Sequence, residues 1–144
     1  MNRPARLAAW LSIASFIGIV PHVMEDLRYG QAANFHMTTV QFECFSGIVV
    51  LATAGAAMLC LAGWKSGAVG VLLIGLLWSV FGAADHYRAF LPGAFRDGLS
   101  SRAWVCLIVT FQIAAAVAAT TSLLQSRESA TSRAFNMRTG RDRR

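Results

Sequence analysis

The sequence predicts an all-α fold, an integral membrane bundle of four transmembrane helices. Of the 144 residues, 56% are hydrophobic and 14% are charged, a balance unlike that of a soluble domain of this length. Four apolar stretches are each about long enough for a helix to cross a hydrocarbon core of roughly 30 Å. These predicted spans cover residues 7–23, 45–64, 67–84 and 103–124. Together they form a predicted membrane domain over residues 1–124.

The first stretch, 7–23, follows a basic start and could be taken for a signal peptide. It runs into Pro21, His22 and Val23, without the small residues that a cleavage site needs. We therefore expect a retained first span. Pro21 removes a backbone donor, so a kink is expected near it.

The second and third stretches, 45–64 and 67–84, are separated by the short segment around Lys65. So short a connection makes two helices antiparallel neighbours. Residues 24–44 connect the first and second spans and are amphipathic, which is compatible either with a lid over the bundle or with an ordinary interfacial loop. Glu43 is expected to begin the second helix.

The fourth stretch, 103–124, is rich in alanine, which allows close helix packing. After it the chain becomes rich in Ser, Thr and Arg, with little apolar content. Residues 125–144 are therefore predicted to form a disordered, basic cytoplasmic tail whose arginines lie on anionic lipid head groups.

The distribution of Lys and Arg predicts the orientation. Nine of the 13 basic residues lie on the side of the chain termini, and four lie on the other side. By the positive-inside rule, both termini are cytoplasmic in the cell (inner) membrane. The net charge of +6 is thus a topology signal, and nucleic acid is not an expected partner.

Histidines and acidic residues gather at the predicted outer end of the bundle. All three histidines and five of the seven acidic residues fall there. An ionisable group near the membrane interior is costly without a partner, so this grouping predicts a functional site. The spacing of His22, Glu25 and Asp26 places them on one helix face. The predicted catalytic residues are His22, Glu25, Asp26, Glu43, Asp85 and His86, whereas His36 and Asp97 are expected in loops.

These groups fit acid–base chemistry on a lipophilic small molecule that enters from the bilayer. Glu25 or Asp26 would donate a proton and His22 or His86 would accept one, with Glu43 and Asp85 orienting them. The predicted substrate-binding residues are Phe45, Trp78 and Phe81, whose rings can stabilise positive charge. The leading hypothesis is therefore a membrane enzyme of the isomerase or cyclase kind.

Other functions use the same residues. Imidazoles and carboxylates also bind divalent metals, although no His-Glu-x-x-His motif occurs, and His22 with His86 could ligate a haem. The alternative is thus a metal- or haem-binding subunit of a redox or transport complex, as a homo-oligomer or in a larger membrane complex. A structural protein without a site is a third reading. Cys44 and Cys106 share a predicted depth and either form a disulfide or pack as small apolar residues.

The string Glu43-Cys44-Phe45-Ser46-Gly47, an apolar run, a basic turn at Lys65 and a third span ending in His86 resemble the DoxX-like family of small four-helix membrane proteins. The resemblance extends over most of the membrane portion, from Leu7 to about Leu124. It implies a four-helix membrane topology. Some members of that family are linked to quinone or sulfur redox systems, but the group of His22, Glu25 and Asp26 does not match the family pattern.

Overall fold

The computed structural model describes residues 2–87 and 99–141, with side chains except at residues 85 and 133–141. The described chain is all-helical, as predicted. Its elements are α1 (Arg3–Ala14), α2 (Phe16–Arg28), the 3₁₀ helix η1 (Gln31–Phe35), α3 (Thr39–Leu61), α4 (Lys65–His86) and α5 (Leu99–Arg141). Four of its helical segments are long and apolar enough to cross a membrane: Arg3–Arg28, Thr39–Leu61, Lys65–Ala84 and Leu99–Ser132.

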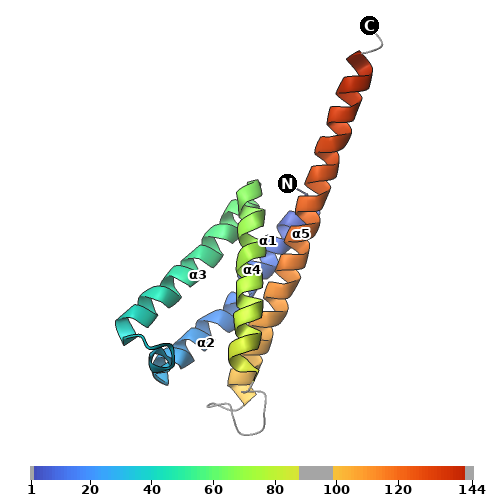
Figure 1. The fold of residues 1–144 in the computed structure, drawn as a ribbon. Coiled ribbons are helices and arrows are strands. Elements are labelled where there is room, and N and C mark those ends of the chain that lie inside the picture. Colours follow the sequence, from blue (N-terminus) through green and yellow to red (C-terminus); the bar gives the residue numbers. More distant parts are fainter. Residues whose placement is uncertain (1, 88–98, 142–144) are drawn as a thin grey trace.

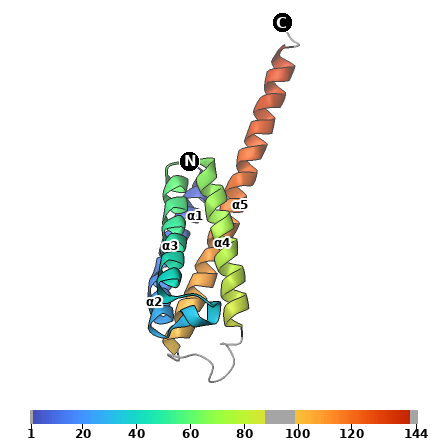
Figure 2. The ribbon, with the colours of Figure 1, turned by 60° about the vertical axis from the view of Figure 1, so that its left-hand side comes forward.

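The helices run up and down the bundle (Figures 1 and 2). The start of α1, the turn between α3 and α4, and the far end of α5 lie toward one end, which we call the terminal end. The end of α2, η1 and the start of α5 lie at the opposite end, which we call the site end. The tight hairpin predicted around Lys65 joins α3 to α4. The chain reverses there at Gly63, whose φ of 84° is one that glycine adopts more readily than other residues.

The first span is broken at Ser15, between α1 and α2, and Pro21 lies inside α2. The Ser15 hydroxyl donates to the carbonyl of Ser12 at 2.6 Å and accepts a hydrogen bond from Gln112 Nε2 at 2.8 Å. A serine hydroxyl that bonds to a nearby carbonyl competes with the helical pattern. The boundary between α1 and α2 therefore lies at a serine that is hydrogen-bonded to α5, and Pro21 lies farther along, inside α2.

The start of α3 corrects the predicted start of the second helix. Thr38 and Gln41 form a capping box in which each side chain accepts a hydrogen bond from the other residue's backbone N–H. This arrangement stabilises a helix start at Thr39, ahead of the predicted boundary at residue 45. Glu43 therefore lies inside the helix and does not begin it.

Helix α5 is longer than the predicted fourth span. It continues past Leu124 to Arg141, so residues 125–141 of the predicted disordered tail are helical and extend beyond the bundle (Figure 1). This segment contains no proline, and its first glycine is Gly140. Several of its Ser and Thr hydroxyls donate to the carbonyl one turn earlier, so these polar groups are hydrogen-bonded within the helix.

Helices α3 and α4 are in close contact at the terminal end and diverge toward the site end (Figure 1). A Cβ atom at Gly67 would overlap the backbone of Cys60, and one at Gly70 would lie 3.0 Å from Ala56 Cβ. Small residues thus bring the two helices together at the terminal end.

Helix α5 packs closely against both α2 and α4. An added Cβ would lie 2.8 Å from the Trp104 carbonyl at Gly18 of α2, and 2.8 Å from the Gln112 carbonyl at Gly75 of α4. These glycines allow α2 and α4 to approach one face of α5. As a result, α2 and α5 form a back wall behind the space between α3 and α4.

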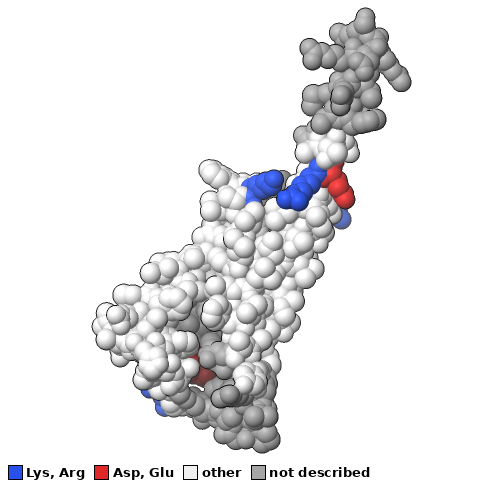
Figure 3. Space-filling model, viewed as in Figure 1, with Lys and Arg blue, Asp and Glu red and all other residues white. Residues whose placement is uncertain are grey.

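The surface of the bundle carries an uncharged belt. On the face in Figure 3, Lys and Arg lie near the two ends and the middle shows no charged side chain. Large apolar side chains such as Leu51, Leu73 and Val117 are exposed on this middle zone of the helices. An exposed apolar belt of this kind is compatible with a multi-pass membrane protein.

Candidate functional site

A cavity of about 610 Å³ occupies the space between the diverging ends of α3 and α4. Residues of α2 and α5 form its back wall, and residues around η1 line it at the site end. Figure 3 shows a hollow between the helices, with acidic atoms visible inside it. The cavity therefore lies at the site end of the bundle, where the sequence predicts the functional groups.

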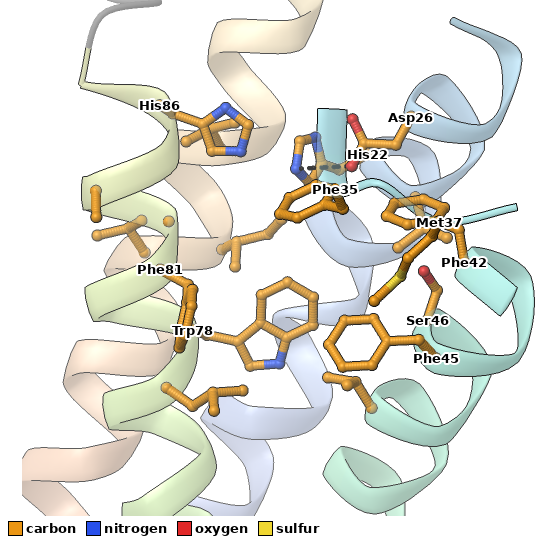
Figure 4. A pocket seen from close by; sticks show the side chains of 18 residues that line it. His22, Asp26, Phe35, Met37, Phe42, Phe45, Ser46, Trp78, Phe81 and His86 are labelled. Carbon is orange, nitrogen blue, oxygen red and sulfur yellow. Dashed lines mark ion pairs between the residues drawn. The ribbon is translucent and has the colours of Figure 1, made fainter. Parts of the chain in front are cut away.

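Aromatic rings form much of the cavity wall (Figure 4). Phe45, Trp78 and Phe81, the three predicted substrate-binding residues, all line it. Trp78 Nε1 donates to Thr53 Oγ1 at 3.3 Å, which ties α4 to α3. Because its polar N–H is engaged there, the indole offers apolar surface to the cavity.

Three of the predicted catalytic residues, His22, Asp26 and His86, meet at one end of the cavity (Figure 4). The His22 Nε2 atom lies 3.5 Å from Asp26 Oδ2, one turn along α2. The ring centroids of His22 and His86 are 4.8 Å apart, with the ring planes at 69°. His22 is buried, with 8% of its surface exposed. The contact between His22 and Asp26 on α2 and a second imidazole from α4 thus form one polar group, which we call the histidine pair with Asp26.

This arrangement suits proton transfer. Imidazole is the side chain that accepts and releases protons most readily near neutral pH. The Asp26 carboxylate can stabilise a proton on His22, and two protonated rings in contact would repel each other. One histidine can therefore hold a proton while the other accepts one.

Glu25, a predicted proton donor, is directed toward α5. Its Oε2 accepts a hydrogen bond from Ser101 Oγ at 2.8 Å, and its Oε1 accepts one from Trp104 Nε1 at 3.1 Å. Glu25 is not among the residues that line the cavity. The structure therefore places it in the contact between α2 and α5, next to the turn that carries His22.

The other predicted residues lie elsewhere. Glu43 is exposed on α3 and does not line the cavity. The side chain of Asp85 and the whole of Asp97 lie outside the described residues. His36 is exposed in the connection after η1, with a φ of 54°, as expected for a loop residue.

Four cavity residues that precede or begin the second span are not among the predicted substrate-binding residues. Phe35, Met37, Phe42 and Ser46 line the cavity, and the rings of Phe35 and Phe42 stack with centroids 5.8 Å apart. The signal was the amphipathic character of residues 24–44. Three of its apolar residues, Phe35, Met37 and Phe42, line the cavity.

The geometry of the site supports metal or haem binding less than it supports proton transfer. Among the residues whose side chains are described, no group of three or more His, Cys, Asp or Glu side chains converges as metal ligands do. A haem between His22 and His86 would have to separate two rings that are in contact. All three cysteines are free, and Cys60 donates to the Ala5 carbonyl at 3.3 Å in the packing between α3 and α1.

Comparison of the chain with protein-family models, with curated proteins and with solved structures found no match. The resemblance to the DoxX-like family therefore stays a prediction from the sequence. Function has to be argued from the cavity itself.

Proposed function

We propose that this protein is an integral membrane enzyme that performs acid–base chemistry, of the isomerase or cyclase kind, on a lipophilic substrate. One observation carries the proposal: the histidine pair with Asp26 lies at one end of an otherwise largely apolar, aromatic cavity. Apolar pockets with a few convergent polar groups are the usual form of small-molecule sites.

In this proposal His86 accepts a proton from the substrate. His22, protonated and paired with Asp26, returns a proton to another atom of the same substrate. The proton taken and the proton given balance, so an isomerisation requires no oxidant or reductant. His86 then releases its proton to solvent and His22 regains one from solvent, which restores both rings for the next turnover. Phe45, Trp78 and Phe81 hold the apolar part of the substrate, and their rings can stabilise positive charge that develops on it.

The proposed setting is the cell membrane, with both termini cytoplasmic and the cavity near the outer face. The uncharged belt and the excess of Lys and Arg at the terminal end support this orientation. A site at that depth meets both lipophilic molecules from the bilayer and protons from the aqueous phase.

A deuterium-transfer assay tests the proposal and does not require an identified substrate. The purified protein is reconstituted in vesicles made from a total lipid extract of its expression host and incubated in D₂O. Mass spectrometry then searches for a lipid that gains deuterium on carbon. We expect one lipid class to be labelled by the wild-type protein, because acid–base catalysis at carbon exchanges protons with solvent.

Two variants make the result specific. His86→Ala should abolish labelling, and Glu43→Gln should retain it because Glu43 is exposed outside the cavity. The proposal is overturned if the wild-type protein labels no lipid, or if His86→Ala labels as fast as wild type.

A further inference from the structure

We infer that the ligand of this cavity is an uncharged amphiphile with a hydrogen-bonding head group, such as an alcohol or a ketone, and that it enters sideways from the bilayer between α3 and α4. The inference rests on the proposed function and specifies its substrate class. Three observations carry it: where the cavity opens, which charges line it and how deep it reaches.

The cavity opens on the apolar belt. Phe45 and Phe81 line it and yet are 52% and 63% exposed, and Leu77 lines it and is 42% exposed. Side chains that face both the interior of a cavity and the outer surface mark its rim. Phe45 belongs to α3 and the other two to α4, so the opening lies between these helices, among side chains that would face lipid.

The charges at the polar end disfavour an anion. Asp26 is the only acidic side chain, and no Lys or Arg lines the cavity, among the side chains that the structure describes. An anionic head group in an apolar cavity requires a cationic partner, and Asp26 would repel it. An uncharged head group needs only hydrogen-bonding groups, and the imidazoles of His22 and His86, which line this end of the cavity, are groups of that kind.

The cavity reaches well below the polar end. Trp78 lies eight residues before His86 on α4, which corresponds to about 12 Å along a helix. There the hydrogen bond from Trp78 to Thr53 joins α4 to α3. A ligand with its head at His86 can therefore bury a ring or a short apolar segment, while a longer tail leaves between Phe45 and Phe81 into the bilayer.

Two probes with one tail test the charge selectivity. A diazirine group is placed at the same position of hexadecanol and of hexadecyl sulfate, which remains ionised at all accessible pH values. The protein in lipid nanodiscs is irradiated with each probe, and the adducts are mapped by mass spectrometry. Adducts on cavity residues are divided by adducts at Val117, an exposed residue of α5, which corrects for partitioning of the probe into the bilayer.

We expect the alcohol to label the cavity with a ratio about tenfold above that of the sulfate, as like-charge repulsion in a low-dielectric site predicts. Asp26→Asn should raise the ratio for the sulfate, and Glu43→Gln should leave both ratios unchanged. If the sulfate labels the cavity as strongly as the alcohol, the inference of an uncharged ligand is wrong although the site stands. If neither probe labels the cavity more than it labels Val117, the proposed function itself is contradicted.

Discussion

The imidazole rings of His22 and His86 are in edge contact, with centroids 4.8 Å apart, although they come from different helices. Asp26 follows His22 by one turn of α2, and its Oδ2 atom lies 3.5 Å from His22 Nε2. If these groups pass one proton between them, they act as a unit, and effects of residues that act as a unit do not add.

We therefore predict strongly non-additive kinetics for the two histidines. His22→Ala and His86→Ala should each slow deuterium transfer by on the order of 100-fold or more, the usual loss when a general acid or base is removed. The double variant should be about as slow as either single variant. Rates of deuterium gain on the labelled lipid measure this, and effects that multiply in the double variant would show that the two rings work independently.

Glu25 is predicted to be a positioning residue. Its carboxylate joins Ser101 and Trp104 of α5 to the turn of α2 that carries His22. Glu25→Ala leaves both donors without their acceptor and should lower the free energy of unfolding by about 1–2 kcal/mol, after allowance for partial exposure. Reversible unfolding in mixed micelles measures the loss.

Deuterium transfer should also fall in Glu25→Ala, with partial recovery in Glu25→Gln, whose amide oxygen can still accept one of the two hydrogen bonds. Glu43→Ala, which removes an exposed glutamate of α3, is the matched control and should change neither property. Full activity in Glu25→Ala would remove Glu25 from the account of the site.

Two glycines should respond in opposite ways to the same substitution. At Gly75 an added Cβ would lie 2.8 Å from the Gln112 carbonyl and 3.0 Å from Ala116 Cβ, so Gly75→Ala should destabilise the bundle by about 1–3 kcal/mol. At Gly55 nothing lies within 4 Å, so Gly55→Ala should stabilise α3 by up to about 1 kcal/mol through helix propensity. Unfolding of both variants in mixed micelles gives the comparison. Equal effects at the two sites would contradict the close approach of α4 to α5.

Trp78 separates the role of an aromatic surface from that of a hydrogen bond. Trp78→Phe keeps a ring in the cavity and loses the bond to Thr53, whose hydroxyl still donates to the Val49 carbonyl at 2.7 Å. It should retain most of the labelling by the hexadecanol probe, with a stability change below about 1 kcal/mol. Trp78→Ala should reduce labelling severalfold. Equal losses in the two variants would assign the effect to the hydrogen bond.

The sequence predicts the helices well because apolar length alone decides whether a segment can span a membrane. It predicts their ends less well, since ends depend on local hydrogen bonds. The capping box can be recognised in the sequence as Thr38 followed three residues later by Gln41, and it sets the start of α3 ahead of the predicted boundary. The break at Ser15 could not be predicted from the sequence, because it involves a hydrogen bond from Gln112, which is far away along the chain.

The candidate site shows the same division. His22 and Asp26 could be placed together because helical spacing puts them on one face. His86 was grouped with them because the ends of the first and third predicted spans were expected to lie at the same depth in the membrane. The same reasoning grouped Glu25 and Glu43 with them, yet Glu25 bonds to Ser101 and Trp104 and Glu43 is exposed. Depth in the membrane is readable from a sequence, whereas the direction of a side chain depends on which helices pack together.

The most direct test of the central claim is chemical rescue of the histidine pair. Deuterium transfer to the labelled lipid is measured for the wild-type protein and for His22→Gly and His86→Gly, each with and without added imidazole. We expect each variant to lose transfer, and we expect imidazole, which can occupy the vacated space and carry the proton, to restore part of it in a concentration-dependent way. Transfer at the wild-type rate in the double variant His22→Gly/His86→Gly, without imidazole, would contradict the claim that these two rings move the proton.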